Sequence, residues 1–402
     1  MYQLKKISTA IAMVGFSTIL FVGQSIAATT DNVGMSNNMN MTDSMSNMNS
    51  MNTTSGMSTT NSMNTTSSSA PMNDVSPVTN GVSQQPASNN RSATSPNKFL
   101  PTIKYTTDNL PTAATRVNAA TWKTGDKIDR VLGTKLQALL NWHNNGVGSV
   151  DGQWGKNTRK AMQAFQKANG LSITENLNNE TWQALTKNEK LLAQPVLVSY
   201  QLSEADVNVK TAKIPAEATE KAKLEGMYYE SLMEALAEKF HMTEGYLKAL
   251  NPNAKFTAGE TITVYNPGNP NTKPVSRVVA DKTTETLYAY DSNNNLVASY
   301  PTTVGSTATP SPTGTHTVKV KVHEPNYTYT ADDGSRSIIP PGPNNPVGLV
   351  WIGLSKPTYG IHGSPDPARI SRQASAGCIR LTNWDALALL GVIQDGATVE
   401  FK

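Results

Sequence analysis

The sequence predicts a multidomain α+β protein, with short helices in its N-terminal half and a mainly β domain with one helix at its C-terminal end. Leu132, Leu136 and Leu139 recur at the spacing of an amphipathic helix. From about residue 273 the pattern changes, and apolar residues run in short or alternating blocks between Gly and Pro, as they do in β-strands. A last helical pattern begins at Asn383.

The first 27 residues have the pattern of a secretory signal peptide. Lys5 and Lys6 precede an apolar run over 11–22, which is too short to span a bilayer, and small residues at 25 and 27 form a cleavage site. The short run favours a cleaved leader over a membrane anchor. We therefore expect export across the inner membrane to the periplasm, with no stable membrane span in the mature chain.

The charge balance and the cysteine count narrow the function classes. The formal net charge of the 402-residue chain is +4, or +2 without Lys5 and Lys6, which is too balanced for a nucleic-acid binder. Cys378 is the single cysteine. In an exported protein, a single cysteine forms an intermolecular link, a buried inert thiol or a reactive thiol. Composition alone leaves these three interpretations open.

Residues 28–97 are a low-complexity stretch built from Asn, Ser, Thr and Met. This composition cannot bury enough apolar surface to offset the entropy lost on ordering, so we expect a disordered tether. Thioether sulfur is a ligand that suits Cu(I). The methionines are irregularly spaced, however, and neither His nor Cys accompanies them, so a flexible spacer is favoured over a copper site.

Two helical segments follow the tether. The first, over 120–190, is expected to form three short helices around three apolar residues: Leu136, Phe165 and Trp182. It holds no catalytic constellation, and we interpret His143 and Asp151 as surface or turn residues. The second, over 222–268, shows two short helical patterns and then the alternating strand 261–264. We interpret His241, which follows Phe240 at the end of the first helix, as a surface residue or a residue of the helix C-terminus.

The β-rich region over 273–402 contains four expected strands, at 287–290, 296–304, 318–322 and 350–354. His316 alternates with Val318 and Val320, so we expect it in the core, and we place His323 in a loop. The sequence has no metal-ligand spacing and no phosphate-binding loop, so we expect neither a metal nor a cofactor.

Cys378 and His362 form the candidate catalytic pair. A thiol near neutral pH is only a few per cent thiolate, so a cysteine nucleophile needs a base or a cation beside it. Sixteen residues separate His362 from Cys378, which is enough chain for a loop to bring them together. The N–H groups of Gly377 and Cys378 are candidates for an oxyanion hole. If Cys378 begins a strand, Arg380 shares its face and is placed either to hold a substrate carboxylate or to support the site. On spacing alone, a buried inert thiol is equally favoured.

Several separated motifs in this region resemble the YkuD family of L,D-transpeptidase catalytic domains. They are S-P-T-G-T (311–315), G-P-N-N-P-V-G (342–348), Y-G-I-H-G (359–363), S-x-G-C-I-R-L (375–381) and N-x-D (383–385). The resemblance implies a β-sandwich with one helix, with Cys378 as the acylated nucleophile, His362 as its base, and a backbone carbonyl near Gly363 that orients the imidazole. The other residues that it places at the site are Ser375, Gly377, Arg380 and Tyr359. Many members have a histidine where this chain has Ala376, so His362 has to carry all proton transfer.

The two helical segments resemble wall-binding modules. D-G-Q-W-G-K-N-T (151–158), with F-Q (165–166), is similar to the peptidoglycan-binding-like three-helix domain. L-A-E-K-F (236–240), L-N-P (250–252) and A-G-E-T-I-T-V (258–264) are similar to a βααβ LysM module, although the usual G-D-T strand before the helices is absent. These resemblances imply contact with peptidoglycan glycan and a wall-associated protein.

The implied reaction is acyl transfer on peptidoglycan stem tetrapeptides. Cys378 would attack the carbonyl of the third residue, at an L-centre of meso-diaminopimelate, and release the terminal D-alanine. The acceptor amine would come from another stem peptide (a 3–3 cross-link), a lipoprotein lysine or a free D-amino acid, and carbapenems would acylate the same thiol. Water as acceptor would make an L,D-carboxypeptidase. Two competing functions are an endopeptidase that uses the same dyad and a wall-binding protein with an inactive catalytic domain.

Overall fold

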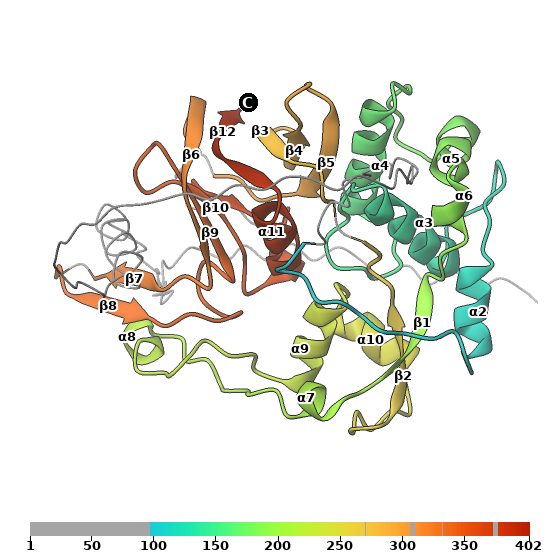
Figure 1. The fold of residues 1–402 in the computed structure, drawn as a ribbon, viewed down its shortest axis with the longest axis horizontal. Coiled ribbons are helices and arrows are strands. Elements are labelled where there is room, and N and C mark those ends of the chain that lie inside the picture. The colour runs from blue at the N-terminus through green and yellow to red at the C-terminus, as the bar shows by residue number, and fades with distance from the viewer. Residues whose placement is uncertain (1–96, 270, 306–309, 332, 373–376) are drawn as a thin grey trace, which may run out of the picture. The chain divides into compact units, whose positions relative to one another are not determined.

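The computed structural model describes residues 97–402, except 270, 306–309, 332 and 373–376 (Figure 1). The expected leader over 1–27, nearly all of the expected tether over 28–97, and Ser375 lie outside the described residues. Among the helices of the described ranges, none is long and apolar enough to cross a membrane.

The first described segment is a helical bundle. Its helices are α2 (Thr112–Asn118), α3 (Arg130–Trp142), α4 (Lys156–Ala168), α5 (Asn179–Thr186) and α6 (Glu189–Leu192). The expected three helices correspond to α3, α4 and α5. The Asp129 side chain caps α3 by accepting from the Leu132 N–H at 3.0 Å. A Cβ on Gly133 would lie 2.1 Å from the carbonyl oxygen of Gly152, which itself has φ +74°, so glycine at both positions lets the turn reach α3.

The second segment combines short helices with a two-stranded antiparallel sheet. Its elements are β1 (Leu197–Gln201), α7 (Glu204–Val207), α8 (Ala218–Lys221), α9 (Leu232–Lys239), α10 (Glu244–Leu250) and β2 (Thr261–Tyr265). The expected helices and strand correspond to α9, α10 and β2. The strand that pairs with β2 is β1, which lies upstream of the range 222–268. Because β1 lacks the G-D-T sequence, the sequence motif did not identify it. The likeness of this segment to a LysM module stays a prediction.

One hydrophobic core runs through both segments. Leu136 and Phe165 from the bundle belong to the same buried cluster as Phe240 and Tyr265, and each of the four is at most 1% exposed. Segments this short bury a smaller fraction of their surface on folding than large domains do, so each is only marginally stable on its own. The common core therefore joins two regions that the sequence suggested as separate modules.

Eight strands form one curled sheet in the order β11-β10-β9-β6-β12-β3-β4-β5. Their bounds are β3 (Val275–Asp281), β4 (Thr286–Tyr290), β5 (Leu296–Pro301), β6 (Gly314–His323), β9 (Val350–Leu354), β10 (Gly360–His362), β11 (Ile379–Arg380) and β12 (Ile393–Phe401). The four expected strands correspond to β4, β5, β6 and β9. Neighbours pair antiparallel, apart from β12 with β3 and β10 with β11, which pair parallel. Two further strands, β7 (Tyr327–Thr330) and β8 (Arg336–Ile339), form a hairpin of their own.

The two ends of the curled sheet meet. Thr303, just beyond β5, exchanges two backbone hydrogen bonds of 3.0 Å with Arg380 in β11. The expected last helix, α11 (Asn383–Leu390), packs against β6, β9 and β10. A short 3-10 helix, η1 (Pro367–Arg369), lies in the connection from β10 to β11. The sheet thus closes on itself around a core that α11 completes.

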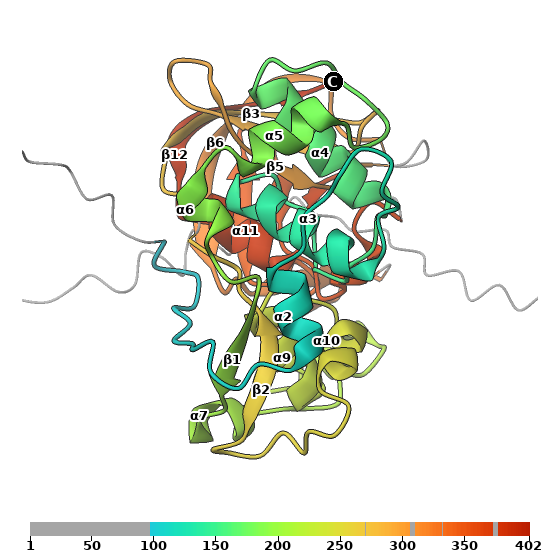
Figure 2. The ribbon, with the colours of Figure 1, turned by 90° about the vertical axis from the view of Figure 1, so that its right-hand side faces the viewer.

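The helical bundle covers the edge strand β5 (Figure 2). The Gly146 N–H donates to the Ser299 carbonyl at 2.8 Å, and the Ser299 N–H donates to the Asn144 carbonyl at 2.9 Å. Ala164 of α4 adds apolar contact by packing with Val279 and Tyr288. An uncovered edge strand exposes unpaired backbone groups, and here the bundle pairs with both backbone groups of Ser299.

The environments of three histidines differ from the sequence interpretation. His241 follows the end of α9, but it is not on the surface: it is 5% exposed and stacks on Trp384 of α11, with ring centroids 5.1 Å apart. His316 is only half-buried against Phe401, because the first residues of β6 extend past the core. His323 is the last residue of β6 and not a loop residue. His143 lies in the turn after α3, as expected, with Nε2 2.9 Å from the Leu185 carbonyl oxygen.

Candidate active site

Cys378 lies at the entrance of β11, directly after Gly377. Gly377 has φ +104°, and a Cβ there would lie 2.8 Å from the ring of Tyr359, so only glycine suits this turn. Ile379 is buried in the core of the curled sheet, whereas Cys378 belongs to a different buried cluster. The expected alternation along this strand is therefore confirmed, and Cys378 faces away from the main core.

His362 is the last residue of β10, the parallel neighbour of β11. The register pairs His362 with Arg380, and the Leu381 N–H donates to the His362 carbonyl at 2.9 Å. The imidazole Nδ1 lies 2.7 Å from the Gly363 carbonyl oxygen. A carbonyl can only accept, so Nδ1 carries the proton in this contact and Nε2 keeps a lone pair. The imidazole is thus held in the tautomer that a general base requires.

Burial governs the ionisation of both groups. It raises the pKa of the Cys378 thiol to about 11, while a backbone hydrogen bond at Gly360 and the charge of Arg380 act in the opposite direction. Burial also lowers the pKa of His362 to about 3; Arg380 lowers this pKa further, and the bond to Gly363 opposes the change. In this structure, both groups are therefore neutral at rest: a thiol at the entrance of β11 and an imidazole on the neighbouring strand β10.

Aromatic side chains line the space around the pair. Trp351 of β9 stacks on His362, with ring centroids 5.9 Å apart and planes 26° from parallel. Tyr327 of β7 is in the same buried cluster as Cys378 and Trp351. Burial raises the pKa of the Tyr327 hydroxyl, and a charge on Cys378 raises it further. On another side of the thiol, the Thr358 carbonyl oxygen lies 3.7 Å from the Cys378 sulfur.

A segment of the N-terminal half covers this cluster. Residues 211–229, which we call the strap, pack on the β7–β8 hairpin, with α8 against β8. Met227 at its end is fully buried in the cluster that contains Cys378. Its N–H donates to the Pro341 carbonyl at 2.8 Å, and its carbonyl accepts from the Asn344 N–H at 2.9 Å. The strap and the hairpin together leave Cys378 only 3% exposed.

Met227→Ala is expected to make Cys378 more reactive toward small alkylating reagents, by several-fold at constant pH. The truncation opens space in the cluster above the thiol and costs roughly 2–5 kcal/mol of folding free energy. Intact mass measured over time after adding iodoacetamide gives the rate. Ile338→Ala, which removes an exposed side chain from the same hairpin, is the control and should leave the rate unchanged. Equal rates in the wild type and Met227→Ala would contradict the covering role.

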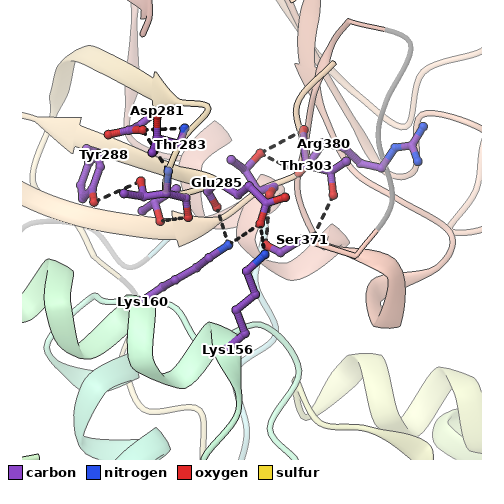
Figure 3. A network of polar contacts seen from close by, with 12 residues as sticks. Lys156, Lys160, Asp281, Thr283, Glu285, Tyr288, Thr303, Ser371 and Arg380 are labelled. Carbon is purple, nitrogen blue, oxygen red and sulfur yellow. Dashed lines mark hydrogen bonds and ion pairs between the residues drawn. The ribbon is translucent and has the colours of Figure 1, made fainter. Parts of the chain in front are cut away.

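A polar network anchors the strand that carries Cys378 (Figure 3). Glu285 accepts from Lys156 and Lys160 of α4, the latter at 2.8 Å, and its carbonyl accepts from the Thr302 N–H at 2.9 Å. The hydroxyl of Thr302 donates to the Arg380 carbonyl at 2.9 Å. A continuous chain of contacts therefore connects the helical bundle with β11.

Ser371 joins the same network (Figure 3). Its N–H donates to the Thr303 hydroxyl at 2.9 Å, and its hydroxyl donates to the Thr302 carbonyl at 3.0 Å. Thr303 is the residue whose backbone pairs with Arg380. The chain at Ser371, seven positions before Cys378, is thus tied to the strand that follows the cysteine.

The structure brings most of the predicted site residues together. Gly363 holds His362, Arg380 affects the pKa of both members of the pair, and the Tyr359 ring packs at Gly377. Ser375 lies outside the described residues. The roles of these residues in catalysis stay predictions.

Three residues at the site escaped the sequence interpretation: Trp351, Met227 and Asn383. Asn383 had a signal, since it begins the N-x-D motif. Trp351 and Met227 had none, because an apolar residue in a strand or loop is ordinarily a packing residue. Over the described part of the chain, no group of three or more His, Cys, Asp or Glu side chains is arranged to hold a metal ion.

The reactivity of Cys378 should rise steeply with pH. With a pKa of about 11, only about one thiol in 10⁴ is ionised at pH 7, and the thiolate fraction grows about tenfold per pH unit. We expect the alkylation rate of the resting protein to increase from pH 7 to pH 10 without levelling off near the ordinary cysteine value. Because the chain has one cysteine, intact mass reports this thiol alone. A plateau of the alkylation rate below pH 8 would show that Cys378 is already ionised in the resting protein, as one member of an ion pair.

Comparison with known proteins identifies the class to which this fold and site belong. A family model described as "L,D-transpeptidase catalytic domain" (YkuD) matches residues 275–401, and one described as "Putative peptidoglycan binding domain" matches residues 134–185. Both matches agree with the sequence resemblances.

Two curated relatives align with more than the catalytic domain. The "Putative L,D-transpeptidase YkuD" of Bacillus licheniformis is 31% identical over 170 residues, which is 42% of this chain and 91% of that protein. Its counterpart in Bacillus subtilis is 29% identical over 169 residues, again 42% of this chain and 91% of that protein. The chain belongs to the L,D-transpeptidase family of the YkuD type. Among solved structures, the catalytic domain of the Enterococcus faecium L,D-transpeptidase is 22% identical and covers 32% of this chain and 96% of that one, with a TM-score of 0.25.

Proposed function

We propose that this protein is an exported L,D-transpeptidase that acts on peptidoglycan stem tetrapeptides through an acyl-enzyme on Cys378. The observation that carries the proposal is the parallel pairing of β10 with β11. This pairing sets the His362 imidazole, oriented by the Gly363 carbonyl, on the strand next to the one that begins directly after Cys378. Nucleophile, base and orienting group are the three parts that cysteine acyl transfer requires.

In the first half-reaction, His362 Nε2 takes the proton of the Cys378 thiol as the sulfur attacks the carbonyl of the third stem residue. A tetrahedral intermediate forms, with its negative charge on the former carbonyl oxygen. The imidazolium then returns the proton to the leaving amine, the C–N bond breaks, and D-alanine departs. A thioester between Cys378 and the stem peptide remains.

In the second half-reaction, an acceptor amine attacks this thioester while neutral His362 removes the amine proton. The new amide bond forms, the C–S bond breaks, and the Cys378 thiol is restored. The charge of Arg380 lowers the pKa of the thiol and so favours sulfur as nucleophile and as leaving group, although the same charge opposes the imidazolium of His362. The N–H groups of Gly377 and Cys378 remain the proposed oxyanion hole.

The location of the protein and the identity of the acceptor amine depend on features other than Cys378 and His362. The expected leader and the peptidoglycan-binding match support a wall-associated periplasmic protein. The acceptor is a second stem peptide, a free D-amino acid or a lipoprotein lysine. Carbapenems are expected to acylate Cys378.

The test is incubation of the mature protein with a disaccharide tetrapeptide, with and without a D-amino acid. The expected results are release of D-alanine, a covalent adduct on Cys378 by intact mass, and incorporation of the added amine. Hydrolysis that persists unchanged with excess amine would instead make the protein an L,D-carboxypeptidase. If wall material is bound but neither an adduct nor D-alanine is detected, the chain is an inactive wall-binding protein.

A further inference from the structure

Glu238 is a buried carboxyl that takes no part in the acyl-transfer steps. It projects from α9, and the Asn383 side-chain Nδ2 donates to its two oxygens at 3.1 and 3.4 Å. The Tyr229 hydroxyl is also hydrogen-bonded to this carboxyl. The second segment of the N-terminal half thus makes a direct polar contact with the first residue of α11, in the catalytic domain.

Asn383 in turn contacts the backbone that holds His362. Its Oδ1 accepts from the Leu349 N–H at 3.0 Å. The same oxygen occupies the space that a Cβ would take on Gly348 or Gly363, at 2.1 and 2.4 Å from those positions. The carbonyl of Gly363 is the group that orients the imidazole. One amide therefore lies between Glu238 and the support of the catalytic base.

The two ends of this amide are not interchangeable. Nδ2 donates to Glu238 and to the Pro343 carbonyl at 3.1 Å, while Oδ1 accepts from Leu349. If the amide of Asn383 rotated by half a turn, its oxygen would face the Glu238 and Pro343 oxygens, and its NH₂ would face the Leu349 N–H. The contacts with the Pro343 carbonyl and the Leu349 N–H would be repulsive, and the hydrogen bonds from Nδ2 to Glu238 would be lost. Pro343 and Leu349 therefore select one orientation of the amide, and Glu238 supplies a further acceptor that holds Nδ2 in it.

We propose that Glu238 is a positioning residue for the acyl transfer: it fixes the Asn383 amide, which braces the Gly363 backbone that orients His362. The inference rests on the proposed function, and it makes the helix α9 of the N-terminal half part of the catalytic apparatus. Asn383 is 2% exposed, so water does not readily replace the carboxyl as its acceptor.

The ionisation state of Glu238 decides which substitution best preserves the properties of its side chain. Burial raises its pKa to about 8; the charge of Glu234 adds to this change, and the bonds from Asn383 and Tyr229 oppose it. Asp206 and Lys239 line the same cavity of about 270 Å³ but are not among the groups that shift this pKa. At pH 7 the carboxyl is therefore mostly neutral, and glutamine keeps its shape, its neutrality and one acceptor oxygen.

The test compares Glu238→Leu, which keeps volume without an acceptor, with Glu238→Gln, in the mature full-length protein. Glu238→Leu is expected to lower kcat for D-alanine release about tenfold with KM unchanged, because a misplaced base impairs the chemical step. Glu238→Gln should restore kcat to near the wild-type value at pH 7. Glu244→Gln, an exposed change on α10, is the control. Wild-type kcat in folded Glu238→Leu, or no rescue by glutamine, would overturn the proposal.

The rate of Cys378 alkylation and the release of D-alanine by the wild type together distinguish failure of this proposal from failure of the proposed function. Alkylation of Cys378 at pH 7 needs no peptidoglycan. Its rate should fall several-fold in Glu238→Leu and remain normal in Glu238→Gln. Failure of the wild type to release D-alanine would reject the proposed function and leave this comparison intact. If Glu238→Leu does not fold, Glu238→Gln and Asn383→Leu test the proposal in its place. Asn383→Leu should slow the alkylation of Cys378. An unchanged alkylation rate in Asn383→Leu would overturn the proposal.

The stability of the folded protein supplies a further check on the Glu238 environment. An acid whose pKa is raised on folding, here from 4.5 to about 8, contributes stability at low pH that is lost as the pH rises through this interval. The melting temperature of Glu238→Gln should therefore depend less on pH than that of the wild type between pH 5 and 9. If the melting temperatures of the two proteins change with pH in parallel, the carboxyl of Glu238 is solvated as in an exposed glutamate.

Discussion

Cys378→Ala is expected to reduce D-alanine release by at least about 10⁴-fold, because no other group in the pair can form the thioester. The variant should still fold, since alanine replaces a small side chain in a cluster formed mainly by larger ones such as Tyr327 and Trp351. Chromatography of the released amino acid gives the rate, and intact mass shows the loss of the covalent adduct.

Cys378→Ser is the matched control for that experiment. It keeps the size of the side chain and replaces the thiol by a hydroxyl, which is a far weaker nucleophile near neutral pH. We expect it to bind stem peptide and to form no adduct. If either variant releases D-alanine at the wild-type rate, Cys378 is not the nucleophile and the proposed function fails.

His362→Ala is expected to lower kcat for D-alanine release by about 10²–10⁴-fold, the range that a positioned general base contributes. The effect should lie near the upper end, because Ala376 stands where many family members have a second histidine. KM should change little, since the imidazole acts on a proton and not on the bound peptide. Steady-state kinetics with a tetrapeptide substrate separates the two constants.

The matched control is His316→Ala, which removes a half-buried imidazole of the same domain at the start of β6. This variant should retain wild-type kinetics. A His362→Ala protein with normal kcat would mean that another group removes the thiol proton, and the carbonyl of Gly363 would then have no catalytic purpose.

The burial of Cys378 and His362 bears on how the proposed reaction would start. With the thiol pKa raised and the imidazole pKa lowered by burial, the thiolate–imidazolium state is disfavoured in the closed structure. Displacement of the strap and the hairpin by a stem peptide would change the surroundings of both groups. The positive charge of Arg380 then favours the thiolate. Substrate binding and activation of the nucleophile are thus expected to be coupled.

Local patterns were sufficient for much of the secondary structure. Helical spacing around Leu136, and strand alternation around Tyr288, are properties of short stretches, and the structure confirms α3 and β4. The sequence also predicted that Cys378 and Ile379 face opposite sides, because this alternation depends only on the two-residue period of a strand. Where partners lie far apart in sequence, the same reasoning failed, as it did for His241, which is buried by Trp384.

The sequence by itself determined the family, a candidate catalytic pair and the type of elements such as α3, β4 and α11, because motifs and periodicity are written in consecutive residues. Only the tertiary structure decided that the helical segments share one core, that the sheet closes through Thr303 and Arg380, and that the strap buries Cys378. It alone also placed Glu238 against Asn383, 145 positions apart. Such contacts depend on how separate elements pack, and no local pattern encodes the hydrogen bond between two buried side chains that the chain brings together only on folding.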